Sequence, residues 1–185
     1  MTATQLRRLA PLLIVAAGFI LGPILVHRLF PYELRTTMLD LRATPAPLAP
    51  VEFQDDAGRK ITLDRFHGRF VLLNFWATWC PPCKAEMPSL NSLASHFPTT
   101  DLSIVPVSID AAGVVAARSY YAELRLDRLQ VYVDPSMDAM HAIAAVGIPT
   151  TLLLDRDGRE IGRLVGAAQW DSPAIMEGLA KVLAR

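Results

Sequence analysis

The chain has 185 residues, 52% of them hydrophobic, and its 18 Lys and Arg balance its 18 Asp and Glu. This balance, with no basic stripe, argues against nucleic acid as a partner. Only two cysteines are present, too few for a structural disulfide framework. The length suits one domain with its own core and about one additional element.

The first element in chain order is an apolar segment near the N-terminus. Residues 9–26 carry no charged side chain, and as a helix they would span about 27 Å, close to the thickness of a bilayer's hydrocarbon core. Arg7 and Arg8 precede this run, which favours a cytoplasmic N-terminus by the positive-inside rule. The alternative is a signal peptide cleaved after Val15-Ala16-Ala17, but cleavage there would leave an apolar run on the mature chain.

A short proline-rich stretch follows the apolar segment. Residues 43–50 contain three prolines, which is typical of a semi-rigid, extended linker. The sequence therefore predicts a cytoplasmic N-terminus, a transmembrane signal anchor, a linker and one folded domain, over residues 1–8, 9–30, 31–50 and 51–185. In a bacterial cell this arrangement would tether the folded domain to the inner membrane on its periplasmic side.

Alternating strands and helices are predicted in the folded domain. A leading hairpin is expected around the turn signal Asp55-Asp56-Ala57-Gly58, with Glu52 and Asp55 at the surface, and the apolar run Phe70–Trp76 is typical of a buried central strand. Strands are expected at 51–53, 60–63, 70–76, 102–109, 130–133, 150–154 and 160–165, and helices at 81–97, 114–124, 136–145 and 173–183. This order predicts a mixed sheet with helices on both faces, a three-layer α/β sandwich.

Both cysteines lie in Trp79-Cys80-Pro81-Pro82-Cys83, where the predicted central strand gives way to a helix. A zinc site would need further ligands at short spacing, and none flank the pair. A helix N-terminus favours a thiolate, so Cys80 is expected to be the exposed nucleophile and Cys83 the resolving thiol. Pro81 and Pro82 fit the first helical turn, whose residues donate no intrahelical hydrogen bond. The spacing indicates reversible thiol–disulfide chemistry.

Two segments together resemble the thioredoxin superfamily. Phe75–Cys83, with Pro88 beyond it, resembles the active site of that superfamily, and Val146–Thr151 resembles its second signature, a cis-proline loop. The resemblance implies a thioredoxin-like sandwich with an N-terminal hairpin and a central insertion, and no cofactor. It also implies that a cis Pro149 faces the cysteines, whereas the residues alone leave a trans proline at an edge strand equally open. The residues expected to contact a partner chain are Trp79, Pro81, Pro82, Ile148 and Pro149.

Within that superfamily, the chain resembles the membrane-anchored TlpA/ResA-like thiol-disulfide oxidoreductases. The resemblance rests on Glu86-Met87-Pro88 and on Asp155–Arg163, and Val165–Trp170 is similar to the TlpA branch. Thioredoxin itself has a buried aspartate where this chain has Asn74, which cannot accept a proton. The resemblance implies that Glu86, three residues after Cys83, tunes the thiol pKa values and relays a proton. The pattern alone favours a solvated Glu86 on the helix surface.

The resemblance implies a reductase of disulfides in partner proteins, in the biogenesis of the copper site of cytochrome oxidase or of cytochrome c. The expected substrates are a copper chaperone, the oxidase copper subunit or apocytochrome c, and a membrane thiol reductase would return the electrons. One alternative is an oxidase of the same fold, because the motif does not set the direction of electron flow. Another is a copper-binding metallochaperone that uses soft ligands. Its candidate ligands are Cys80, Cys83, His67, His96, His141, Met137 and Met140.

Overall fold

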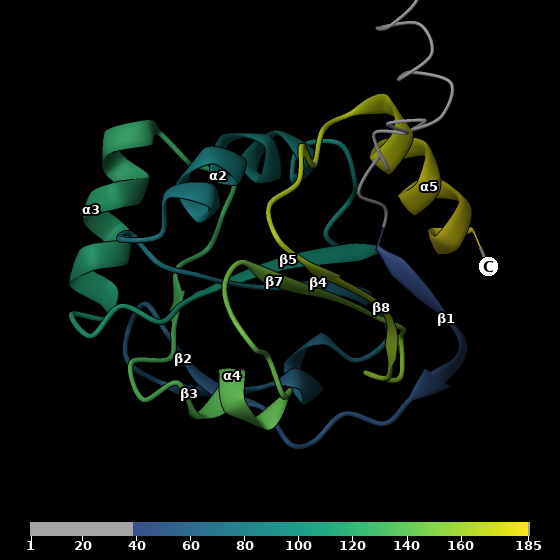
Figure 1. Ribbon diagram of the computed structural model, residues 1–185, viewed down its shortest axis with the longest axis horizontal. Helices are drawn as coiled ribbons and strands as arrows, with labels where there is room; N and C mark the ends of the chain where they lie inside the picture. The colour runs from purple at the N-terminus through teal and green to yellow at the C-terminus, as the bar shows by residue number, and fades with distance from the viewer. Residues whose placement is uncertain (1–38, 185) are drawn as a thin grey trace, which may run out of the picture. The chain divides into compact units, whose positions relative to one another are not determined.

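The computed structural model describes residues 39–184, which form one eight-stranded sheet in the order β1-β8-β7-β4-β5-β6-β2-β3 (Figure 1). The strands are β1 (Asp40–Ala46), β2 (Glu52–Asp55), β3 (Lys60–Thr62), β4 (Phe70–Trp76), β5 (Leu102–Ser108), β6 (Tyr132–Val133), β7 (Thr150–Leu154) and β8 (Glu160–Val165). The helices are η1 (Leu63–Phe66), α2 (Pro81–Leu93), α3 (Val114–Leu124), α4 (Asp138–Ala142) and α5 (Pro173–Leu183).

The predicted cytoplasmic residues 1–8 and the predicted anchor over residues 9–30 lie outside the described residues. Within residues 39–184, no helix combines the length and the apolar character that a bilayer crossing requires.

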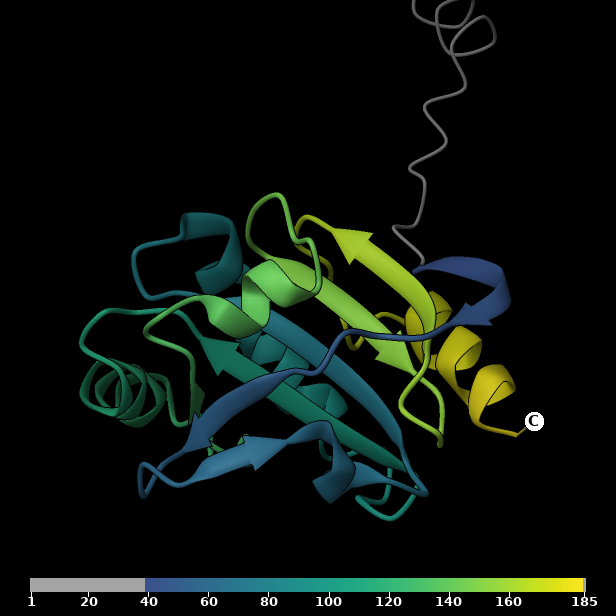
Figure 2. The same ribbon diagram turned by 90° about the horizontal axis from the view of Figure 1, so that it is seen from below.

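Strand β4 is the centre of the sheet, as its apolar sequence predicts. It pairs in parallel with β5, where Phe70 lies opposite Leu102, and antiparallel with β7, where Phe75 lies opposite Thr150. All seven of its residues are buried. Figures 1 and 2 show α2 and α5 on one face of the sheet and α4 on the other. The predicted mixed sheet with helices on both faces is therefore confirmed.

The predicted linker over 31–50 is wrong for residues 40–46. These residues form β1, which pairs antiparallel with β8, and Arg42 makes an ion pair of 3.2 Å with Glu160 of that strand. Pro45 lies within β1, and a proline is tolerated there because an edge strand has one side that needs no hydrogen bonds. The extended backbone expected from the prolines is thus present, but much of it is paired with the sheet.

Most other elements are found where they were predicted, with shorter ends. The strands Thr150–Leu154 and Glu160–Val165 and the helix Pro173–Leu183 match their predicted bounds. Helix α2 ends at Leu93 instead of residue 97, and β6 and α4 are shorter than predicted. Asp55 was expected at the surface but is buried, because its Oδ1 accepts hydrogen bonds from the backbone N–H groups of Ala57 and Arg59 and so closes the β2–β3 turn.

Candidate active site

Cys80 and Cys83 form a disulfide at the start of α2, at the end of the sheet where β4 terminates. Cys80 is the N-cap residue of this helix, and its Sγ accepts a hydrogen bond of 3.2 Å from the N–H of Cys83. Pro81 and Pro82 occupy the first helical turn and are exposed, as their lack of an N–H allows. Cys80 was expected to be exposed, but in the disulfide only 4% of it is accessible, against 0% for Cys83.

The predicted second signature lies against the disulfide. The Ile148–Pro149 peptide bond is cis, and the carbonyl oxygen of Ile148 is 3.8 Å from Cys80 Sγ. The carbonyl of Pro149 accepts a hydrogen bond of 2.8 Å from the N–H of Gly166, which ties this loop to the end of β8. The structure therefore brings together the two sequence segments that support the resemblance.

Exposed apolar side chains flank this end of the sheet. Trp79 precedes Cys80 and is 64% exposed, Val146 belongs to the cis-proline loop and is 90% exposed, and Val165 ends β8 and is 55% exposed. Val165 pairs with Thr150, the residue that follows the cis-proline. These three side chains, here called the apolar rim, leave apolar surface exposed at this end of the sheet.

Glu86 belongs to α2 and its side chain is buried, which excludes a solvated position on the helix surface. Its Oε1 accepts a hydrogen bond of 2.9 Å from Asn74 Nδ2. Its Oε2 accepts bonds of 3.0 Å from the N–H of Ala168 and 2.9 Å from Trp170 Nε1. Burial raises the pKa of Glu86, and the three hydrogen bonds oppose that rise by stabilising the charged form.

Asn74 orients Glu86 instead of taking up a proton. Its Nδ2 also donates to Thr151 Oγ1 at 2.9 Å, whereas its Oδ1 has no hydrogen-bond partner among residues 39–184. Glu86 and Cys83 are three residues apart on α2 and both are buried, so a carboxylate lies on the same helix face as Cys83. A group of this kind can hold or release the proton that a thiol exchanges.

The residues that hold Glu86 from the opposite side were not predicted from the sequence. Ser89 Oγ accepts a hydrogen bond of 3.0 Å from the N–H of Trp170, which fixes the segment that carries Ala168 and Trp170 against α2. In the sequence, Trp170 was noted only as the end of a segment that is similar to the TlpA branch. No local pattern could have assigned its role, because it lies 84 residues after Glu86 in the chain.

Asp110 was also missed. It follows β5 and is 5% exposed. Its Oδ2 accepts hydrogen bonds from the N–H of Thr78 at 2.9 Å and from Ser108 Oγ at 2.7 Å, and its Oδ1 accepts one from Thr78 Oγ1 at 2.6 Å. Asp110 thereby fixes the loop immediately before Trp79 and Cys80. An acidic residue directly after a strand that neighbours β4 is a signal that could have identified it.

The proposed copper ligands are not assembled into a site. Within residues 39–184, no three His, Cys, Asp or Glu side chains are close enough to hold a metal ion. His67 contacts Asp64 and the ring of His96 contacts the carbonyl of Ser92. Met140 is buried, while Met137 is partly exposed. The geometry gives the metallochaperone alternative no support.

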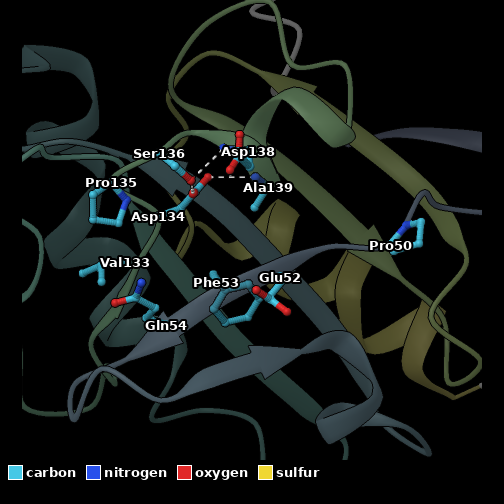
Figure 3. Close-up of a pocket in the computed structure, with 10 residues that line it drawn as sticks. All are labelled: Pro50, Glu52, Phe53, Gln54, Val133, Asp134, Pro135, Ser136, Asp138 and Ala139. Atoms are coloured by element: carbon cyan, nitrogen blue, oxygen red, sulfur yellow. Dashed lines mark hydrogen bonds between the residues drawn. The ribbon is translucent and has the colours of Figure 1, made fainter.

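A hollow of about 330 Å³ lies away from the disulfide, between β2 and the loop that leads into α4 (Figure 3). Asp134 lines it, and its Oδ2 accepts hydrogen bonds from the N–H groups of Ala139 and Met140, while Ser136 Oγ donates to its Oδ1. These bonds satisfy backbone N–H groups at the start of α4, so the carboxylate of Asp134 has a structural role.

Comparisons with known proteins show which family and which solved structures this chain is similar to. A family model described as the AhpC/TSA family matches residues 43–169. The thiol-disulfide oxidoreductase ResA of Bacillus thuringiensis subsp. konkukian is 32% identical over 112 residues, which are 60% of this chain and 64% of that protein. The chain therefore spans less than two thirds of the length of the curated relatives that it matches.

Solved structures share the fold. A Chlorobium tepidum protein assigned as a thiol:disulfide interchange protein DsbE superposes with a TM-score of 0.63 at 27% identity, covering 79% of this chain and 97% of that one. StoA from Bacillus subtilis superposes with a TM-score of 0.58 at 24% identity, covering 76% of this chain and all of the other, and shows the likeness of fold alone.

Proposed function

The chain belongs to the AhpC/TSA family, and on that premise we propose that it is a thiol-disulfide oxidoreductase that reduces disulfides in partner proteins. The expected place in the thioredoxin superfamily, among its TlpA/ResA-like members, is confirmed. The observation that carries the proposal is the Cys80–Cys83 disulfide at a helix N-terminus, with the cis Ile148–Pro149 loop against it and a buried Glu86 three residues after Cys83.

In the proposed reaction, the thiolate of reduced Cys80 attacks one sulfur of the partner's disulfide and releases the other as a thiolate. The thiolate of Cys83 then attacks Cys80 Sγ, breaks the mixed disulfide and frees the second partner thiol. Two electrons pass from the dithiol to the partner, and the Cys80–Cys83 disulfide remains. The N–H of Cys83 and the helix N-terminus stabilise negative charge on Cys80 Sγ, which favours its role as nucleophile.

Glu86 serves the second step of this reaction. Cys83 must lose a proton before it attacks, and Glu86 lies on the same buried face of α2. Burial raises the pKa of Glu86, which brings its proton affinity closer to that of a thiol. Glu86 therefore accepts the proton from Cys83 and returns it when the protein is reduced again. The apolar rim and the exposed prolines Pro81 and Pro82 would contact the partner.

The proposal extends to the location of the reaction. Residues 9–30 would anchor the chain in the bacterial inner membrane, with residues 51–185 in the periplasm and a membrane thiol reductase as electron donor. The support for this location is the charge-free run over residues 9–26 behind Arg7 and Arg8. Substrates would be a copper chaperone or the copper subunit of cytochrome oxidase, supported by the similarity of Val165–Trp170 to the TlpA branch. Apocytochrome c is the alternative substrate.

The test is to trap the reaction half-way. In cells that express full-length Cys83→Ser, Cys80 should accumulate in mixed disulfides with its substrates, which mass spectrometry after non-reducing electrophoresis identifies. The matched control is the double variant Cys80→Ser/Cys83→Ser, which should trap nothing. Capture of a copper-site assembly protein supports the copper branch, and capture of apocytochrome c moves the function to cytochrome c biogenesis. If the single variant traps no more than the control, disulfide exchange with proteins is refuted.

The direction of electron flow needs a second measurement. Equilibration of the Cys80–Cys83 couple with glutathione or dithiothreitol buffers gives its reduction potential. A potential well below about −200 mV supports a reductase, and one near about −120 mV supports the disulfide-donating oxidase.

A further inference from the structure

A second hollow, of about 290 Å³, lies at the end of the sheet opposite the disulfide. It is lined by Arg65 of η1, by Arg69 three residues after η1, and by Arg128 from the segment before β6. None of the residues that line it is acidic. Three arginines therefore line one hollow whose lining residues include no carboxylate.

The arginine side chains are partly held in place. Arg69 donates hydrogen bonds to the carbonyl oxygens of Arg65 at 3.0 Å and Thr99 at 3.3 Å, and its guanidinium lies 5.6 Å from the centre of the Phe66 ring. The N–H of Arg128 donates to Asn91 Oδ1 at 2.9 Å, which fixes the backbone there. Such fixed positions reduce the entropy that a bound ligand would have to overcome.

These charges lack a strong partner within residues 39–184. Arg65 and Arg69 make no ion pair in this part of the chain, and Arg128 has only Asp127, at 3.8 Å and with both side chains mostly exposed. A pair of that kind contributes little. Asp64, next to Arg65, contacts His67 and Thr62 instead. Like charges around one hollow repel one another, and an anion inside it would relieve that repulsion.

Polar side chains that line the hollow lie close to these arginines. Tyr132 lines it, and burial raises the pKa of this phenol; Arg65 and Arg69 oppose the rise, while Asp55 and Asp56 add to it. Both guanidinium groups are thus within electrostatic reach of the Tyr132 hydroxyl. Ser103 on β5 also lines the hollow and adds a hydroxyl group.

We propose that this hollow, here called the arginine pocket, binds a phosphate group through Arg65, Arg69 and Arg128. The planar guanidinium group matches the oxygens of a phosphate and can contact two of them at once. The pocket lies beside Leu102 at the start of β5, whereas Cys80 follows the other end of β4, and a seven-residue strand is about 20 Å long. A ligand in the pocket would leave the disulfide accessible to a partner.

The test uses the full-length chain in nanodiscs of zwitterionic lipid, with inorganic phosphate as the probe at low ionic strength. The arginine Nε–H signals of ¹⁵N-labelled protein should shift and saturate with phosphate, but not with chloride at equal ionic strength. Arg65→Gln and Arg69→Gln should each weaken phosphate binding about ten-fold or more. Arg118→Gln is the matched control, because Arg118 pairs with Asp56 outside the pocket.

Two results would overturn the proposal: no saturable shift with phosphate, or equal losses in the Arg69→Gln variant and the Arg118→Gln control. Nanodiscs that contain phosphatidylglycerol then separate the two sources of phosphate. If the pocket binds a lipid headgroup, the arginine Nε–H signals in these nanodiscs already have their bound-state shifts before phosphate is added, and added phosphate competes only weakly. If the pocket takes free phosphate, the titration is the same in both kinds of nanodisc.

Discussion

Replacement of Asp110 tests whether a buried carboxylate holds the loop before Cys80 in place. In Asp110→Ala, the N–H of Thr78 and the hydroxyl groups of Thr78 and Ser108 all lose their acceptor. Hydrogen bonds to a charged group contribute about 1.5–3 kcal/mol each, but the hydroxyl of the half-buried Thr78 can turn to water and the buried carboxylate no longer has to be desolvated. We therefore expect the free energy of unfolding to fall by about 2–4 kcal/mol.

Asp110→Asn is the matched control for this change. An amide oxygen in the place of Oδ2 still accepts from Thr78 N–H and Ser108 Oγ, and the amide nitrogen then faces Thr78 Oγ1, which can accept. The expected loss is about 1 kcal/mol. Cys80 is two residues beyond Thr78, so Asp110→Ala should also disorder the loop that carries Cys80. If this raises the activation free energy of mixed-disulfide formation by about 1.4 kcal/mol, the reaction slows about ten-fold.

Urea unfolding of the oxidised protein, followed by tryptophan fluorescence, measures the stability of both variants and of Thr78→Val. A double-mutant cycle of Asp110→Ala with Thr78→Val should show coupling of about 1 kcal/mol, since the two residues share a hydrogen bond. This role of Asp110 is refuted if Asp110→Ala loses less than about 0.5 kcal/mol, or if Asp110→Asn loses as much as Asp110→Ala.

Two further predictions concern Glu86. Burial places its folded-state pKa above the unfolded value of 4.5. The stability that it contributes is therefore fully present below that value and is lost as the pH rises through the folded-state pKa. Over that window the unfolding free energy of the native protein should fall relative to Glu86→Gln, which cannot titrate; a difference that stays constant with pH would contradict this. Trp170→Phe removes one donor to Glu86 Oε2 and should raise the carboxyl pKa further, measured by ¹³C NMR; an unchanged or lower pKa would show that the indole does not stabilise the charge.

The centre of the sheet could be predicted because its signals are local. Phe70–Trp76 is an apolar run long enough for a buried strand, and the turn around Gly158 separates two strands whose bounds were predicted correctly. Strand β1 gave no such signal. Its only partner in the sheet is β8, more than one hundred residues later, and its proline is typical of a linker. A strand stabilised mainly by a distant neighbour cannot be recognised from its own residues.

The active site divides in the same way. The positions of Cys80, Cys83 and Pro149 follow from short motifs, and the structure brings them together. The burial of Glu86 does not follow from a motif, because an acidic residue in the second turn of a helix is usually solvated. It depends on Trp170 and Ala168, which reach α2 only when the chain after β8 folds back over it.

Asn74 and Glu86 together explain how the site manages without an acid on β4. Thioredoxin, which this chain resembles, has an aspartate at the position of Asn74. Here that strand position supplies a donor, at 2.9 Å, to a carboxylate carried by α2. The acid therefore shares its helix with Cys83, while two of its three donors come from the segment that follows β8. A shift of that segment would remove donors from Glu86 and favour its protonated form. In the proposed reaction this would change the proton acceptor available to Cys83 without any movement of the cysteines.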